Sequence, residues 1–120
     1  MKIETHNINN IRIAELDSDN LIIKNTQDGI DLLGNLYYQD YDGIVINEKN
    51  ITPEFFDLKN GIAGDILQKF STYRVRLAIV GDFSLYASKS LKDFIFESNR
   101  SKHINFVAST TEAINILSNR

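Results

Sequence analysis

The segment at residues 73–99 constrains the fold of this chain more than any other stretch. Over residues 73–80 the apolar side chains first alternate and then form a continuous run, which is typical of a strand buried on both faces. Gly81 and Asp82 end this strand, a polar loop follows, and an amphipathic helix is predicted from residue 91. A buried strand that leads through a loop into a helix indicates an α/β fold.

The rest of the chain supplies further strands and helices, and one domain over residues 1–120 accounts for all of them. Asn9 and Asn10 predict a tight turn between two N-terminal strands, because Asn tolerates a positive φ angle. The predicted elements are strands at residues 2–7, 11–16, 43–46 and 103–108, helices at residues 27–38 and 61–70, and a final helix after Ser109. Their order predicts a single mixed sheet, with an N-terminal hairpin followed by alternating helices and strands.

Two helix starts have features that need an explanation. Gly61 and Gly64 lie one turn apart, where they allow either close packing of the helix on the sheet or the approach of an anionic ligand. Ser90 is predicted to cap the helix that begins at residue 91, with Asp93 completing a capping box.

Two tyrosines and two arginines are assigned from the periodicity of the apolar residues. Tyr37 is predicted on the apolar face of the first helix, and Tyr73 stands beside the first half of the central strand. Arg74 and Arg76 are predicted to point outward from that strand. They either pair with acids such as Asp65, remain solvated, or form an interaction surface, because Arg and Tyr are enriched at binding hot spots.

The composition limits the functions that this chain can have. It contains no cysteine, which excludes disulfides, thiolate metal sites and a cysteine nucleophile. The net charge of −3 and the pI near 5.3 argue against binding to nucleic acids. No apolar run approaches the ~20 residues needed to cross a bilayer, and the N-terminus lacks the apolar region of a signal peptide. We therefore expect a cytoplasmic protein that binds neither nucleic acid nor membrane.

Polar residues that follow the predicted strands form the candidate site. If the strands ending near residues 46 and 80 are parallel neighbours, their carboxyl ends meet at one edge of the sheet. Glu48 and Asp82 would then hold a cation or a polar ligand, while Lys89 and the adjacent helix N-terminus favour an anion. Roles in turns, in caps and on the solvated surface explain the same pattern. The candidate residues for binding a ligand or partner are Glu48, Asp82, Ser84, Tyr86, Ser88 and Lys89.

The sequence contains no recognisable catalytic or cofactor-binding motif. Ser88 and Lys89 are adjacent and point in different directions, and no Gly-rich nucleophile elbow accompanies them. His6 and His103 belong to no zinc-binding pattern. We therefore expect no catalytic residue, no cofactor and no metal, which favours a protein that is not an enzyme.

The order of the predicted elements resembles that of STAS domains (sulfate transporter and anti-sigma-factor antagonist). Those domains have an N-terminal hairpin followed by alternating helices and strands, at this chain length. In the antagonists, a Ser or Thr at the start of the second main helix is phosphorylated by a partner kinase. Thr52, directly before Pro53, is the nearest match in this chain. The resemblance implies a regulatory domain with Thr52 as a candidate phosphoacceptor.

Longer runs of the sequence resemble a bacterial family, domain of unknown function family 4180. The runs are PEFFDL at residues 53–58, GIAGDILQKF at 61–70, RLAIVGDF at 76–83, SKSL at 88–91 and ESN at 97–99. No activity, cofactor or partner is established for that family, so the resemblance implies a bacterial protein and leaves its role open.

Three hypotheses about function follow. The first is a non-enzymatic regulatory or interaction module that binds a protein partner or a small ligand. The alternative is a small enzyme or an anionic-metabolite sensor that uses Glu48 and the loop at residues 82–90. A third hypothesis is a homodimer formed through an exposed edge strand or through the region around Phe55 and Phe56.

Overall fold

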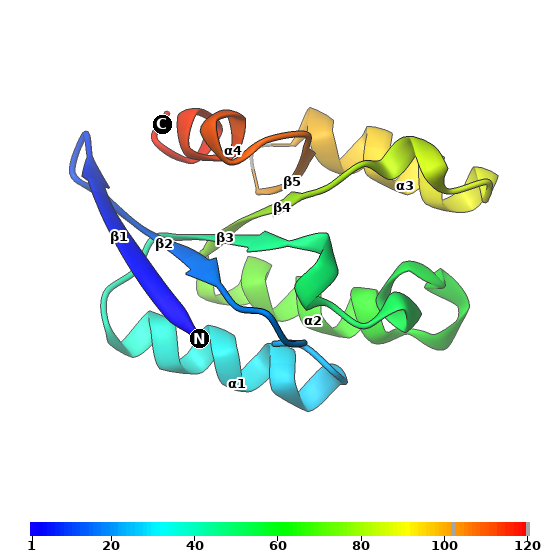
Figure 1. Cartoon of the computed structure of the whole chain (residues 1–120), viewed down its shortest axis with the longest axis horizontal. Helices are drawn as coiled ribbons and strands as arrows, with labels where there is room; N and C mark the ends of the chain where they lie inside the picture. Colours follow the sequence, from blue (N-terminus) through cyan, green and yellow to red (C-terminus); the bar gives the residue numbers. More distant parts are fainter. Residues whose placement is uncertain (102, 120) are drawn as a thin grey trace.

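Five strands form one mixed sheet in the computed structural model, which describes residues 1–101 and 103–119 (Figure 1). The strands are β1 (Lys2–Ile8), β2 (Ile11–Asp17), β3 (Gly43–Asn47), β4 (Arg76–Val80) and β5 (Ile104–Val107). They follow one another across the sheet in chain order; β1 is antiparallel to β2, and the later neighbours are parallel. The predicted α/β fold with one mixed sheet and an N-terminal hairpin is confirmed.

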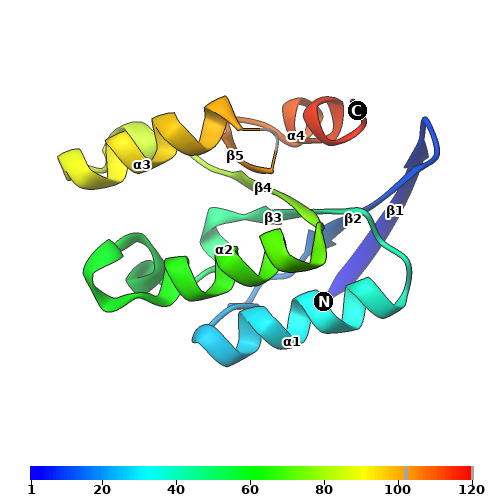
Figure 2. The same ribbon diagram turned by 180° about the vertical axis from the view of Figure 1, so that it is seen from behind.

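Helices cover both faces of this sheet. They are α1 (Thr26–Tyr38), α2 (Ile62–Tyr73), α3 (Lys89–Arg100) and α4 (Thr110–Leu117). The first two lie side by side on one face, α4 lies on the other, and α3 packs along β5 (Figures 1 and 2). The larger core, with Ile46 and Leu77, lies against α1, α2 and α3, and the smaller core, with Ile13 and Val45, lies against α4.

The N-terminal hairpin closes through the predicted Asn-Asn turn. Asn9 and Asn10 have φ angles of 55° and 64°, as a two-residue turn of type I′ requires. After this turn, β2 is buried on both faces, because Ile13 enters the smaller core while Ala14 enters the larger one. The strand that follows the turn is therefore a central strand, and β1 is left at the edge.

The predicted start of the central strand is wrong by three residues. Tyr73 is the last residue of α2, and Arg74 ends the helix in the left-handed region with a φ angle of 57°. Val75 then donates its backbone N–H to the Phe70 carbonyl, so β4 begins only at Arg76. Because Arg74 reverses the chain, it lies at a helix end and does not alternate with Arg76 along a strand.

Close packing explains neither of the glycines at the start of α2. Gly61 has a φ angle of 80° and Gly64 is exposed, and a β-carbon on either would meet no atom within 4 Å. A glycine that is tightly packed against another helix is Gly29 on α1, where a β-carbon would lie 2.6 Å from Cδ1 of Ile66 on α2. The close approach is therefore between two helices, and the absence of a side chain at Gly29 permits it.

The cap of α3 also differs from the prediction. Ser88, and not Ser90, is the N-cap, and its Oγ accepts the backbone N–H of Leu91. Asp93 accepts a hydrogen bond from Nζ of Lys89 at 2.7 Å and so pairs along the helix surface. The helix begins two residues early because Ser88, which has extended backbone angles, is placed to cap it.

Candidate functional site

The carboxyl ends of β3 and β4 bring Glu48 next to Gly81. The two strands are parallel neighbours with Asn47 opposite Val80, which is the arrangement that the candidate site requires, so the residues that follow start side by side. The Glu48 side chain lies over Gly81, where a β-carbon would come within 2.5 Å of Oε1. The missing side chain at Gly81 therefore leaves room for the Glu48 carboxylate at this edge.

Tyr86 fixes the position of that carboxylate. Its hydroxyl donates a hydrogen bond to Oε2 of Glu48, and its ring lies 5.2 Å from the Phe56 ring and 6.4 Å from the Phe83 ring. Desolvation by burial is the largest effect that raises the pKa of the Tyr86 hydroxyl, and the hydrogen bond to Glu48 and the negative charge of Glu48 raise it further. The hydroxyl is protonated at neutral pH, and its hydrogen bond holds the loop after β4 against the loop after β3.

The remaining predicted residues have local partners. Oδ1 of Asp82 accepts hydrogen bonds from the Ser84 hydroxyl at 2.6 Å and from the Ser84 backbone N–H at 3.1 Å. These two hydrogen bonds lower the pKa of Asp82, and the bond from the Ser84 hydroxyl has the larger effect. Ser88 caps α3, and the hydrogen bond to Asp93 raises the pKa of Lys89. Each of these side chains thus stabilises a turn or a helix start.

The predicted residues border two different cavities. Glu48 and Tyr86 border a cavity of about 380 Å³ together with Phe56. Asp82 borders another cavity, of about 450 Å³, together with Glu112 from α4. The structure therefore joins Glu48 and Tyr86 in one place and puts Asp82 in another. Ser84, Ser88 and Lys89 border neither of these two cavities.

Thr52 lies inside the fold rather than on a free helix start. Its side chain accepts the backbone N–H of Glu54 and caps a short 3-10 turn at Pro53–Phe56. Only 8% of Thr52 is exposed, so a kinase would have to open this loop to reach the hydroxyl. The assignment of Thr52 as a phosphoacceptor stays a prediction.

A group of exposed tyrosines lies at the opposite end of the parallel strands, near the amino ends of β3 and β4. We define the tyrosine surface as Tyr37 and Tyr38 at the end of α1 and Tyr73 at the end of α2. The exposed fractions of the three residues are 45%, 87% and 46%. The Tyr37 ring lies 6.2 Å from that of Tyr38 and 5.1 Å from that of Tyr73, with edge-to-face geometry in both pairs. The three rings therefore form one exposed aromatic patch.

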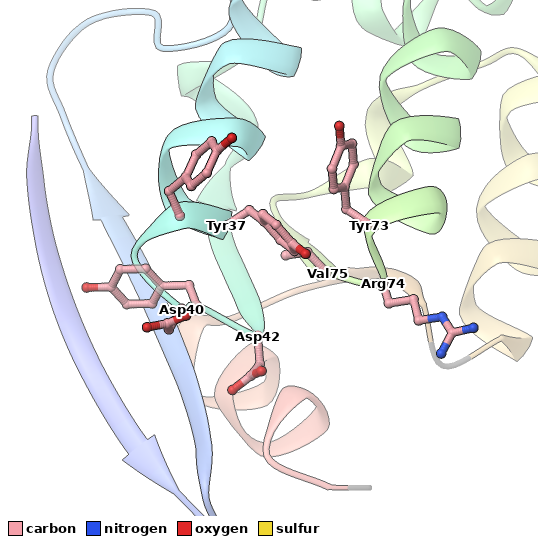
Figure 3. Close-up of a pocket in the computed structure, with 8 residues that line it drawn as sticks. Tyr37, Asp40, Asp42, Tyr73, Arg74 and Val75 are labelled. Carbon is pink, nitrogen blue, oxygen red and sulfur yellow. The ribbon is translucent and has the colours of Figure 1, made fainter.

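The tyrosine surface borders a cavity of about 330 Å³ (Figure 3). Tyr37 and Tyr73 face one another across the space between the two helix ends, and Arg74 extends away from the rings (Figure 3). Asp40 and Asp42 also border the cavity. Within the described part of the chain, the Asp40 carboxylate takes part in no hydrogen bond or ion pair, so a negative charge remains free beside the rings.

Hydrogen bonds and packing hold the floor of this cavity. Tyr41 is buried; its hydroxyl shares a hydrogen bond with that of Thr5 on β1, and the Arg12 guanidinium lies 4.3 Å from the centre of its ring. Asp42 accepts the backbone N–H of Arg12 at 2.8 Å. The surface around the exposed rings is thus anchored to the N-terminal hairpin.

The sequence interpretation placed these tyrosines incorrectly. It put Tyr37 on the apolar face of α1, but Leu32 and Gly29 occupy that face and Tyr37 is nearly half exposed. It put Tyr73 beside a strand, although Tyr73 ends α2. A usable signal was the pair of adjacent tyrosines at the end of a helix, since successive helical residues point in different directions.

One further group of side chains comes together on the hairpin. Glu4, His6 and Glu15 form the one group in the described residues whose ligand atoms, all within 4.8 Å of one another, could hold a metal ion. His6 is hydrogen-bonded to Glu15 at 2.9 Å. Glu4 lies directly opposite Glu15 in the strand pairing, and no Lys or Arg of the described residues forms an ion pair with either.

The chain matches a known protein family over most of its length. The family model described as "Domain of unknown function (DUF4180)" matches residues 8–117. No curated protein and no solved structure matches the chain, so the resemblance to STAS domains stays a prediction. Among the described residues, no helix has the length and apolar character needed to cross a membrane.

Proposed function

Because the chain belongs to the DUF4180 family of domains of unknown function, we propose its role from its surfaces: it is a non-enzymatic interaction module that binds a protein partner. The tyrosine surface is the proposed binding site. The observation that carries the proposal is the exposure of three contacting tyrosine rings at the joined ends of α1 and α2.

The energetics of tyrosine support this site. Tyr is enriched among the residues that dominate binding energies at protein interfaces, because it buries a large rigid ring and keeps a polar tip. Tyr37 and Tyr73 already contact each other before any partner binds, so little side-chain freedom remains to be lost. The patch is therefore suited to binding rather than to stabilising the free protein.

The charge beside the rings favours a basic partner segment. The free carboxylate of Asp40 attracts a cation, and the tyrosine faces attract the same cation through their ring quadrupoles. Arg74 extends away from the rings and so leaves this position open (Figure 3). A lysine or arginine side chain of the partner fits these surroundings best.

A small enzyme or an anionic-metabolite sensor is the weaker alternative. The cavity beside Glu48 and Tyr86 lies where ligands of α/β sheets usually bind. However, Asp82 and Lys89 do not border that cavity, and each is held by a neighbouring residue. A regulatory role, a cytoplasmic location and phosphorylation at Thr52 remain predictions from the sequence.

The experiment uses photo-crosslinking from two positions of similar exposure. A photoreactive residue replaces Tyr38, which is 87% exposed, or Leu85, which is 81% exposed and lies near the other edge of the sheet. In native lysate, position 38 is expected to crosslink one protein through a segment that carries Lys or Arg, and position 85 is expected not to. Equal labelling from both positions, or a captured segment without basic residues, would contradict the proposal.

A further inference from the structure

The edge strand β1 is open over its whole length. Within the described residues its strand neighbour is β2, with which it pairs from Lys2 to Ile8 without a bulge. Six of its seven residues are exposed, and it contains no proline. Bulges and prolines are among the features that normally protect an edge from pairing with another chain, so β1 is available for such pairing.

The hairpin turn determines which main-chain groups of β1 face outward. In a two-residue hairpin, the residues that flank the turn exchange both of their hydrogen bonds, so Ile8 is bonded to Ile11. Bonded and non-bonded pairs alternate along an antiparallel ladder. The residues whose N–H and C=O groups point away from β2 are therefore Ile3, Thr5 and Asn7.

We propose that β1 pairs antiparallel with β1 of a second copy of this chain, about a twofold axis between the two Thr5 residues. This register uses the outward-facing groups and all seven residues of the strand, from Lys2 opposite Ile8 to Ile8 opposite Lys2. Moving the axis to Ile3 or Asn7 leaves part of each strand without a partner. The assembly joins the two sheets into one continuous sheet.

The polar side chains on β1 are complementary in this register. Glu4 of each copy faces His6 of the other in a non-hydrogen-bonded pair, where opposite Cα atoms lie only ~4.5 Å apart. Each imidazole, which already bonds to Glu15 of its own chain, then lies between two carboxylates. A pair of polar side chains that hydrogen-bond directly across two strands is stabilising, and symmetry provides this pair twice. A parallel arrangement would instead place Glu4 beside Glu4.

Thr5→Pro is the most selective test of this interface. It removes an outward-facing N–H at the axis and leaves the hydrogen bonds between β1 and β2 in place. Thr5→Val is the matched control, because it also loses the hydrogen bond to Tyr41 but keeps the N–H. The association state is measured by sedimentation over a concentration series, with a chelator present. Wild type and Thr5→Val are expected to form dimers of twice 13.7 kDa, whereas Thr5→Pro is expected to remain a folded monomer.

A charge exchange tests the register independently of how Thr5→Pro folds. Glu4→Lys is expected to raise the dimer dissociation constant about tenfold, because it removes the acceptor that faces His6 of the other copy. The double variant Glu4→Lys with His6→Glu is expected to restore dimerisation through a Lys–Glu pair across the two strands. A wild-type monomer at all concentrations, or equal dimerisation of the proline variant, would overturn the proposal. A dimer that dissociates when a chelator is added is bridged by metal and would overturn it as well.

Discussion

The ring of Tyr37 lies 5.1 Å from the ring of Tyr73, with the two planes inclined by 64°, and this contact joins the ends of α1 and α2. An edge-to-face pair of this kind normally contributes to a core, yet both residues are nearly half exposed. Tyr38 extends the same patch from the neighbouring position. The proposed binding site is therefore a direct consequence of how the two helices pack.

Two glycines on α1 test that packing. Gly29→Ala places a β-carbon 2.6 Å from Cδ1 and 2.8 Å from Cγ1 of the fully buried Ile66, so it is expected to lower the free energy of unfolding by about 1–3 kcal/mol. Gly34→Ala meets no atom within 4 Å and is expected to raise it by about 0.5–1 kcal/mol. Urea unfolding measures both changes. Equal effects at the two positions would show that α1 and α2 do not pack as described.

A second glycine pair tests the edge where Glu48 lies. Gly81→Ala brings a β-carbon within 2.7 Å of Cβ of Glu48, which cannot swing away, and is expected to cost about 1–3 kcal/mol of unfolding free energy. Gly64→Ala, on the exposed face of α2, is the control and is expected to stabilise by about 0.4–1 kcal/mol. If Gly81→Ala is neutral in chemical denaturation, the Glu48 side chain does not occupy this position.

The hydroxyl of Tyr86 predicts a specific dependence on alkaline pH. Its pKa is raised above the ordinary value of 10.0, first by burial and then by Glu48, so the folded state holds this proton more tightly than the unfolded state. The contribution of this hydroxyl to the free energy of unfolding is fully present below pH 10 and is lost as the pH rises further. Unfolding free energies measured on both sides of pH 10 are expected to fall more steeply for wild type than for Tyr86→Phe. Parallel profiles would count against the hydrogen bond from the Tyr86 hydroxyl to Glu48.

The sequence predicted features whose causes are local. The Asn9-Asn10 turn follows from the positive φ angles that Asn tolerates, and the adjacency of Glu48 to the start of the next loop follows from parallel pairing of β3 and β4. The bond from Tyr86 to Glu48 was not predictable, because it depends on the path of a loop without periodicity.

The tyrosine surface was missed for two physical reasons. Arg74 ends α2 in a left-handed conformation, a position that glycine usually occupies. Because the sequence has no glycine there, the helix end was interpreted as the start of a strand. The approach of α1 to α2 depends on Gly29, whereas the sequence drew attention to Gly61 and Gly64 instead. Both errors displaced Tyr73 from its real position beside Tyr37.

The most direct test of the proposed function is the affinity of the domain for the segment that position 38 captures. Titration calorimetry compares wild type with Tyr73→Ala and with the control Phe96→Ala, which removes a ring that is 64% exposed on α3. Tyr73→Ala is expected to weaken binding by about 30-fold or more, the effect of losing one hot-spot residue, and Phe96→Ala is expected to leave it unchanged. Equal affinities for wild type and Tyr73→Ala would contradict the assignment of the tyrosine surface as the binding site.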